Sequence, residues 1–166
     1  MPMTVSLQPT TIPKVSGVSF KTTIAVDVTA VAYTVGDSIG TGGKALGINR
    51  AVKLVSASIS LKDSVATKPA FTILFFNTAP AGTYTENGAM SVTDADTVAL
   101  CGAVEIAAGD FKQLYTSGPM LAVWAGSPQN MRPADGSDLY IAILADNVWT
   151  PASTSDLQIT LEFEPV

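Results

Sequence analysis

Apolar and polar residues alternate with a period of two along much of this chain. In residues 18–29, one face carries mostly Val, Phe and Ile, while the other carries mostly Ser, Thr, Lys and Asp. Residues 157–164 repeat the pattern, with Leu, Ile, Leu and Phe alternating with Gln, Thr and Glu. Because successive side chains of a strand point to opposite faces, both segments are predicted to be half-buried strands.

Further segments between these two are bounded by turn residues and are also predicted to be strands. In residues 52–62, Val55, Ala57, Ile59 and Leu61 share one face and serines occupy the other. Residues 70–76 and 139–144 are apolar on both faces. A strand of that kind must be covered twice, by an opposing sheet and by either a loop of the same chain or a neighbouring subunit. Weaker strand patterns cover residues 103–106, 111–115 and 120–124.

Helical patterning is nearly absent, and the best candidate is residues 87–95, where Asn87 or Ser91 could cap a short helix that Gly88 weakens. The many short strands are separated by turns rich in the chain's 13 Gly and 10 Pro. This organisation predicts an all-β fold, an antiparallel β-sandwich or jelly roll. Residues 1–17 contain three prolines and five Ser or Thr, which indicates an extended N-terminal arm; residues 18–166 form a single β-sandwich domain.

Composition excludes several classes of function. The 166 residues include no His and carry a net charge of −5. The chain therefore lacks the commonest general base and the commonest transition-metal ligand. An acidic chain with two arginines does not have the charge of a nucleic-acid-binding protein, so no nucleic acid is expected as a partner.

No membrane association is expected either. The apolar run of residues 139–145 is seven residues long, whereas a spanning helix needs about 20. Residues 1–17 have neither a basic start nor an apolar stretch, so they do not resemble a secretory signal. The single Cys101 lies among apolar residues and is interpreted as a small buried side chain of a protein made in a reducing compartment.

The segment from Gly36 to Gly40 matches G-x-S-x-G, the pattern around the nucleophile of many serine hydrolases. Its Ser38 would need a base, and without His the nearest candidate is Lys44. The following residues 40–45 resemble a phosphate-binding loop only loosely, because Ser38 and Ala45 stand where that motif requires Gly and Ser or Thr. A glycine-rich loop between two strands is the favoured interpretation.

Two carboxylate pairs and the aromatic residues are the remaining candidates for binding chemistry. Asp94 with Asp96, and Asp135 with Asp138, could hold Ca²⁺, although Asp is also common in turns. Exposed aromatic rings could form a platform for sugars, although packing is their commoner role. The six candidates are Tyr33, Tyr84, Tyr115, Trp124, Tyr140 and Trp149. We expect no enzyme activity, no catalytic residues, no metal and no cofactor.

Charged residues make up 14% of the chain, against about 25% in typical soluble domains, while 47% are apolar. Interface cores are depleted in charge, so this balance suggests oligomerisation or docking onto a larger assembly. The alternative is that Ala and Val raise the apolar fraction without forming any patch.

The chain resembles small structural proteins of tailed bacteriophages over roughly residues 33–163. The resemblance lies in the spacing of several short segments rather than in a catalytic signature. These segments are residues 33–39, 61–63, 73–77 with Pro80, 85–89, 94–96, 139–140 and 151–153.

The resemblance implies a virion component, and the better-known relatives by architecture are capsid decoration, or cement, proteins. These are β-sandwich subunits, often trimeric, that sit on the outer capsid surface and reinforce contacts between major capsid proteins. The expected partners are therefore the major capsid protein and further copies of this chain in a homotrimer. The expected location is the outer face of the phage head, after synthesis in the host bacterial cytoplasm.

Two segments are predicted to make the contacts. Residues 1–17 would dock on neighbours, and the doubly apolar strand of residues 70–76 would contact another subunit. The residues predicted to lie in these interfaces are Val5, Leu7, Ile12, Val15, Phe71, Leu74 and Phe76. Two other functions stay open at this point: a tail or neck component of the virion, and an adhesin module that binds carbohydrate.

Overall fold

The computed structural model describes residues 18–63, 65–154 and 156–166. The predicted arm of residues 1–17 lies outside them. The described part is mostly strand, and the pairings between its strands are antiparallel, so the all-β prediction is confirmed. In chain order, the elements are β1 (Phe20–Val26), β2 (Lys44–Ala45), β3 (Val52–Leu61), β4 (Phe71–Phe76), α1 (Asp94–Ala99), β5 (Leu100–Ile106), η1 (Ala108–Asp110), β6 (Lys112–Gln113), β7 (Met120–Trp124), β8 (Gln129–Met131), β9 (Tyr140–Ala145) and β10 (Leu157–Pro165).

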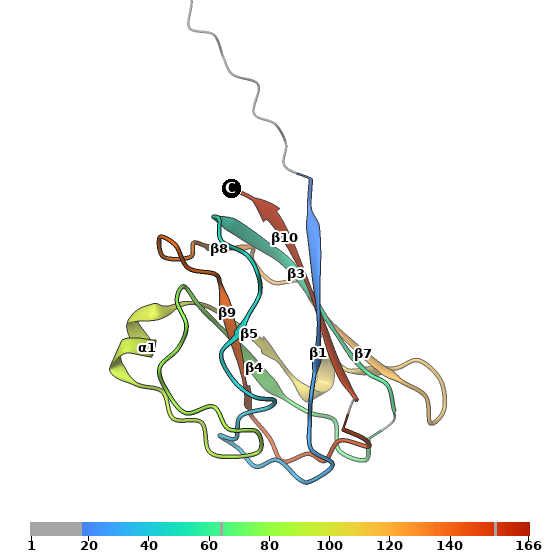
Figure 1. Cartoon of the computed structure of the whole chain (residues 1–166). Coiled ribbons are helices and arrows are strands. Elements are labelled where there is room, and N and C mark those ends of the chain that lie inside the picture. Colours follow the sequence, from blue (N-terminus) through green and yellow to red (C-terminus); the bar gives the residue numbers. More distant parts are fainter. Residues whose placement is uncertain (1–17, 64, 155) are drawn as a thin grey trace, which may run out of the picture.

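The strands form two sheets (Figure 1). The six-stranded sheet has the order β1-β10-β3-β7-β6, with β8 also paired to β3, and the four-stranded sheet has the order β2-β9-β4-β5. The pairings are nested along the chain: β1 pairs with β10, β2 with β9, β3 with β7 and β4 with β5. The chain is therefore arranged like one long hairpin whose successive pairs fall alternately into the two sheets.

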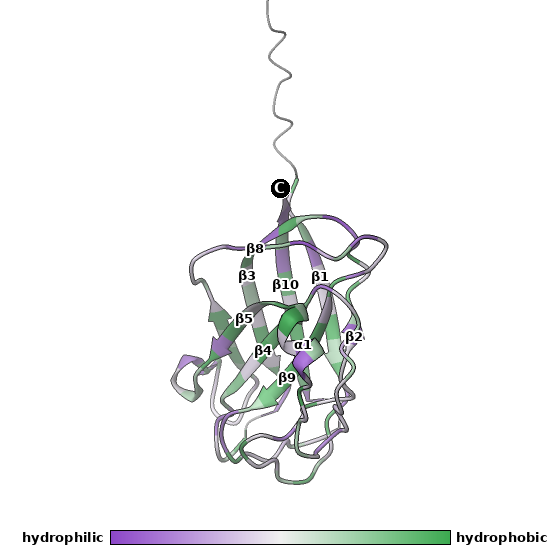
Figure 2. Cartoon of the chain, turned by 90° about the vertical axis from the view of Figure 1, so that its left-hand side faces the viewer, coloured by the Kyte–Doolittle hydropathy of each residue, from purple (hydrophilic) through white to green (hydrophobic). Residues whose placement is uncertain are grey.

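The two sheets enclose a common core. Its buried side chains come from both sheets, for example Ile59 and Phe163 from the larger and Ile73 and Phe75 from the smaller. A second, smaller cluster lies on the opposite face of the four-stranded sheet, beneath α1 (Figure 2). One sheet is thus covered on both faces, by the other sheet and by a segment of its own chain.

The length and register of several strands differ from the alternation pattern. The first strand ends at Val26, although Val28 is also buried, and the pattern of residues 111–115 yields only the short β6. In β3, Val55 does not face the core as predicted. A register shift opposite Glu162 and Phe163 leaves Val55 as an extra residue, so Leu54 is buried in its place. Such a bulge changes the inward set without changing the sequence pattern.

The helix begins later than predicted. Its N-cap is Thr93, which accepts a hydrogen bond from the Asp96 amide, while the Asp96 carboxylate accepts one from the Thr93 amide. This reciprocal capping box satisfies two amides that the first helical turn leaves free. Asn87 and Ser91 both precede this N-cap, so neither of them caps the helix, which corrects the prediction.

The structure also corrects the prediction that Phe71 and Phe76 are available to another subunit. Both rings are fully buried within this chain. Phe71 faces the common core, and Phe76 packs edge-on against Tyr84 at 6.1 Å between ring centroids. The second cover of this strand is therefore the chain's own segment between β4 and β5. Leu74 is half-buried in the same cluster. Val5, Leu7, Ile12 and Val15 lie outside the described residues.

Candidate functional site

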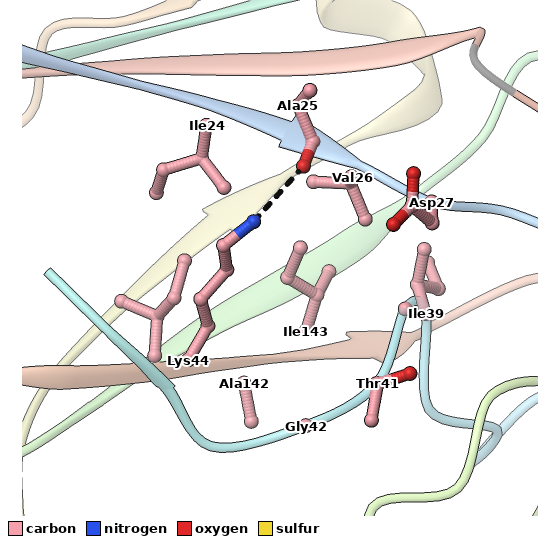
Figure 3. A pocket seen from close by; sticks show the side chains of 12 residues that line it. Ile24, Ala25, Val26, Asp27, Ile39, Thr41, Gly42, Lys44, Ala142 and Ile143 are labelled. Atoms are coloured by element: carbon pink, nitrogen blue, oxygen red, sulfur yellow. Dashed lines mark hydrogen bonds between the residues drawn. The ribbon is translucent and has the colours of Figure 1, made fainter.

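A pocket opens between the two sheets where β1 faces the loop that leads into β2 (Figure 3). Its volume is about 200 Å³. Aliphatic side chains from both sheets form its walls, and Lys44 reaches across it. The lining residues are Ile24, Ala25, Val26, Asp27, Ile39, Gly40, Thr41, Gly42, Lys44, Ile141, Ala142 and Ile143. The pocket is thus a slot at the boundary between the sheets, with aliphatic walls and polar groups such as Asp27 and Lys44 in its lining.

The backbone of β1 faces this slot along an edge that we call the open edge, meaning the side of β1 away from β10. Among the described residues, β1 pairs only with β10. The Lys44 Nζ donates to the Ala25 carbonyl at 3.2 Å, so that carbonyl points away from β10. Val28, three residues later, instead donates its amide toward the opposite side, to the Thr154 carbonyl. By alternation, Lys21 and Thr23 present their amides and carbonyls to the open edge, as Ala25 does.

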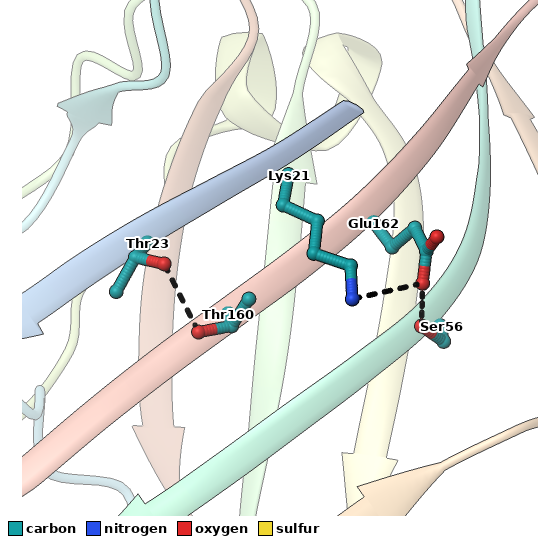
Figure 4. Close-up of polar contacts among 5 residues, drawn as sticks. All are labelled: Lys21, Thr23, Ser56, Thr160 and Glu162. Carbon is teal, nitrogen blue, oxygen red and sulfur yellow. Dashed lines mark hydrogen bonds and ion pairs between the residues drawn. The ribbon is translucent and has the colours of Figure 1, made fainter. Parts of the chain in front are cut away.

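The outward face of the same sheet is polar (Figure 4). Thr23 and Thr160 share a hydrogen bond of 3.1 Å between their hydroxyls. Glu162 accepts a bond from Ser56 at 3.1 Å and pairs with Lys21 at 3.8 Å. Beside the open edge, the sheet is therefore hydroxyl-rich outside and aliphatic inside, which is the environment that any strand added there would meet.

The other side of the molecule shows a closed edge, formed by β5 where it meets β8. The Gln129 side-chain amide accepts a bond from the Ala103 amide at 3.2 Å and donates one to the Ala103 carbonyl at 2.7 Å. Gly102 permits this approach, because a Cβ there would lie 2.7 Å from the Gln129 Oε1. The glutamine imitates a paired strand and so occupies backbone groups that would otherwise be free.

A third feature is the end of the molecule where the loops after β1 and β9 meet. The Tyr33 amide donates to the Trp149 carbonyl at 2.9 Å, and the two buried rings stack with centroids 5.5 Å apart. The Tyr33 hydroxyl donates to Glu86, and the Thr29 amide donates to the same Glu86 oxygen at 3.0 Å. Burial, and then the neighbouring Glu86, raise the pKa of Tyr33, so it stays protonated as a donor.

This buried cluster holds loops that expose apolar side chains. Val31, Val35 and Val148 are 60%, 68% and 56% exposed, and the Tyr33–Trp149 bridge brings their loops together. We call these three residues the loop-end valines. An aliphatic group on an anchored loop stays in water unless a partner covers it, so this end is a candidate contact surface.

Comparison with known proteins identifies no family for this chain. No family model matches it, and no curated protein matches its sequence. In the described part of the chain, no helix is long and apolar enough to span a membrane.

Ser38, at the centre of the G-x-S-x-G pattern, lies in a loop, as the favoured interpretation held. It is fully buried, and its hydroxyl donates to the Gly40 carbonyl at 3.2 Å. Gly36 and Gly40 both have positive φ, at 94° and 76°, and a Cβ on Gly40 would lie 2.8 Å from the Val26 side chain. The glycines serve the path of the loop. Lys44 bonds to Ala25 on the far side of the pocket rather than to the serine.

Asp96, one carboxylate of the sequence motifs, serves local structure. Asp96 is buried and accepts bonds from the amides of Ala81 and Thr93 at 2.6 and 2.9 Å. Burial by itself raises the pKa of Asp96, but these bonds outweigh it and hold the pKa below its usual range. Asp94 is exposed on the first helical turn. Within the described residues, no three His, Cys, Asp or Glu side chains are grouped as a metal site would require.

The aromatic residues do not assemble into one exposed platform. Tyr33, Trp149 and Tyr84 are buried. Burial, followed by the charge of Asp96, raises the pKa of Tyr84 to about 12. Tyr115 is the aromatic ring that stands most exposed, on the turn between β6 and β7. Cys101 is half-buried, its thiol contacts the Phe75 carbonyl at 3.5 Å, and burial raises its pKa.

Sequence reasoning missed the open edge, the pocket and the loop-end valines. Edge position depends on which strands pair, and that is a long-range property that alternation does not contain. The signal for the loop-end valines was weak but present, because Val31, Val35 and Val148 fall between predicted strands rather than inside them.

Proposed function

We propose that this chain is a structural protein of a tailed-phage virion, and specifically a capsid decoration protein. It would dock on the outer face of the head and add binding energy at contacts between major capsid proteins. The chemistry needed is the burial of apolar surface at an interface, and it requires neither a nucleophile nor a metal. Self-association into a homotrimer belongs to the same proposal.

The fold is assigned here as a jelly roll, which is a β-sandwich of two sheets. Support comes from the nested pairing of β1 with β10, β2 with β9, β3 with β7 and β4 with β5. Viral capsid proteins, lectins and cupins all use this architecture. The fold is therefore compatible with a virion protein but does not by itself select one function.

The loop end is the observation that carries the docking proposal. The loop-end valines are exposed, yet a buried cluster of Tyr33, Trp149 and Glu86 fixes the loops beneath them. Rigid presentation lowers the entropy lost on binding, so such a surface favours association. Contacts of standard size bury about 1,600 Å² in total, and several contacts from one trimer would add avidity.

The direct test uses capsids assembled from the major capsid protein alone. Wild-type chain should bind them, and the triple variant Val31→Ser, Val35→Ser, Val148→Ser should lose at least tenfold in affinity. Val123→Ser is the matched control, because Val123 is 56% exposed on β7, away from the loop end. Circular dichroism and melting temperature should match among all three proteins. Equal binding by the triple variant would contradict the role of the loop end.

Copy number in purified virions separates the proposal from its main alternative. A decoration protein should be present in hundreds of copies per particle, whereas a tail or neck component should be present in far fewer. Binding of the isolated chain to a panel of bacterial polysaccharides would instead favour an adhesin.

A further inference from the structure

We propose that the open edge of β1 is a strand-addition site, and that its occupant is residues 4–8 of a second copy of this chain. This inference names the contact through which copies of this chain would associate, and it rests on the proposed function for that self-association. It does not depend on docking to a capsid. It assigns a role to the pocket beside β1 and to part of the segment of residues 1–17.

The backbone of β1 is largely unpaired at the open edge. Lys21, Thr23 and Ala25 direct backbone donors and acceptors away from β10, and the described residues provide one bond to them, from the Lys44 Nζ to the Ala25 carbonyl. All three residues are exposed. Free edges of this kind pair readily with another extended segment, since main-chain hydrogen bonds then form along its length.

The pocket lies directly beside the open edge. Ile24 and Val26 are the inward residues of β1, and they line the slot together with Ile141 and Ile143 of the facing sheet. A strand laid beside β1 would continue the larger sheet, so its inward side chains would enter this slot (Figure 3). The site therefore offers both backbone pairing and a recess with aliphatic walls at the same place.

The sequence of residues 4–8 matches the two faces of the site. Residues 4–8 read Thr-Val-Ser-Leu-Gln, which alternates polar and apolar. Val5 and Leu7 would share the inward face, while Thr4, Ser6 and Gln8 would join an outward face that already consists of residues such as Thr23 and Thr160. Both faces of the added strand would then meet side chains of their own character.

A second copy is preferred over the same chain as the source. Residues 9–17 lie between the proposed strand and Val18, and they include Pro9 and Pro13. Nine residues can span up to about 30 Å, which is enough to reach a neighbouring copy, and the prolines favour an extended path over a tight return to the same chain. Each copy would donate one segment and accept another. Such a head-to-tail contact closes into a ring when the rotation allows, and three copies of 17.1 kDa would give the proposed trimer.

The test is a cross-link between two full-length chains in a Cys101→Ser background. One chain carries Ser6→Cys and a size tag, and the other carries Thr23→Cys. Both positions are central in their strands and face outward, so they come close for either strand direction. Under mild oxidation the mixture should form a covalent heterodimer. The control pairs Ser6→Cys with Val123→Cys on the exposed face of β7 and should give at least tenfold less product.

Three further results decide the proposal. Adding Val5→Ser and Leu7→Ser to the donor should abolish the heterodimer, whereas Thr4→Ser should preserve it. If the cross-link forms as strongly with Val123→Cys, the contact is not specific and the proposal fails. If one chain carrying both cysteines cross-links to itself at every dilution, the second copy is overturned as the occupant. Because no capsid is present, failure of capsid binding leaves this result unchanged.

Discussion

The two sides of the molecule treat an exposed strand edge in opposite ways. At the closed edge, Gln129 bonds to both the amide and the carbonyl of Ala103, and Gly102 leaves room for it. At the open edge, Lys44 bonds to one carbonyl of β1, and a pocket of about 200 Å³ lies beside it. The difference indicates that the β5 edge is capped at Ala103 by a side chain of the same chain, while the β1 edge is available to a partner.

The largest loss of stability should follow mutation of Asp96, in the helix that precedes the closed edge. Its carboxylate organises the start of α1, which runs directly into β5. Asp96→Ala removes a buried acceptor of two amides and should lower the free energy of unfolding by about 2 kcal/mol. Asp94→Ala, on the exposed side of the same turn, should lower it by about 0.5 kcal/mol. Urea unfolding followed by tryptophan fluorescence measures both, and equal losses would contradict the assignment.

Acid should reduce the contribution of the Asp96 carboxylate to the stability of the fold. The pKa of Asp96 is lower in the folded chain than its ordinary value of 3.8, so its contribution is fully present above that value. Stability should therefore fall as the pH drops from 3.8 through the folded pKa. Asp96→Asn should remove this part of the pH dependence. Unfolding curves of the two proteins between pH 7 and pH 2 test it, and parallel profiles would refute the prediction.

Removing the two bonds between Gln129 and Ala103 should convert the closed edge into an open one. Gln129→Ala frees the amide and carbonyl of Ala103 and should reduce stability by about 1 kcal/mol. It should also raise self-association, since β5 becomes available for pairing. Gln129→Glu keeps the acceptor but loses the donor, so its stability and its self-association should lie between those of wild type and Gln129→Ala. Analytical ultracentrifugation measures the self-association and urea unfolding measures the stability. If neither changes in Gln129→Ala, the bonds between Gln129 and Ala103 have no role in closing the edge.

The smallest effect on stability is expected at Lys44. Its bond to the Ala25 carbonyl is exposed, so Lys44→Met should change the free energy of unfolding by less than about 0.5 kcal/mol. Removing this competing donor should nevertheless strengthen pairing at the open edge. The heterodimer cross-link should form at lower protein concentration in Lys44→Met than in wild type. A weaker cross-link would show that Lys44 assists the contact.

The strands were largely predictable from the sequence, whereas the surfaces were not. The alternation in residues 18–29 and 157–164 identified β1 and β10, because burial of one face of a strand requires an apolar residue at every second position. The bulge at Val55 could not be predicted from this alternation, since it depends on how β3 pairs with β10. Likewise, the doubly apolar pattern ending at Phe76 indicated two covers but did not reveal that Tyr84, from the same chain, provides one of them.

The open edge could be inferred only after the pairings were known. Nothing in the sequence around Thr23 distinguishes an edge strand from a central one, because the side chains alternate in either case. The contact between Gln129 and Ala103 could not be predicted either, since it joins residues from β5 and β8 that are distant in the sequence. Both sites depend on long-range pairing.

Amide hydrogen exchange at the two edges is the most direct measurement of the central claim, that one edge is closed within the chain and the other by a second copy. The Ala103 amide, bonded to Gln129, should be protected at every protein concentration. The amides of Thr23 and Ala25 should exchange quickly in dilute solution, become protected as concentration rises, and lose that protection in Val5→Ser, Leu7→Ser. Fast exchange of Thr23 and Ala25 at all concentrations would contradict the account.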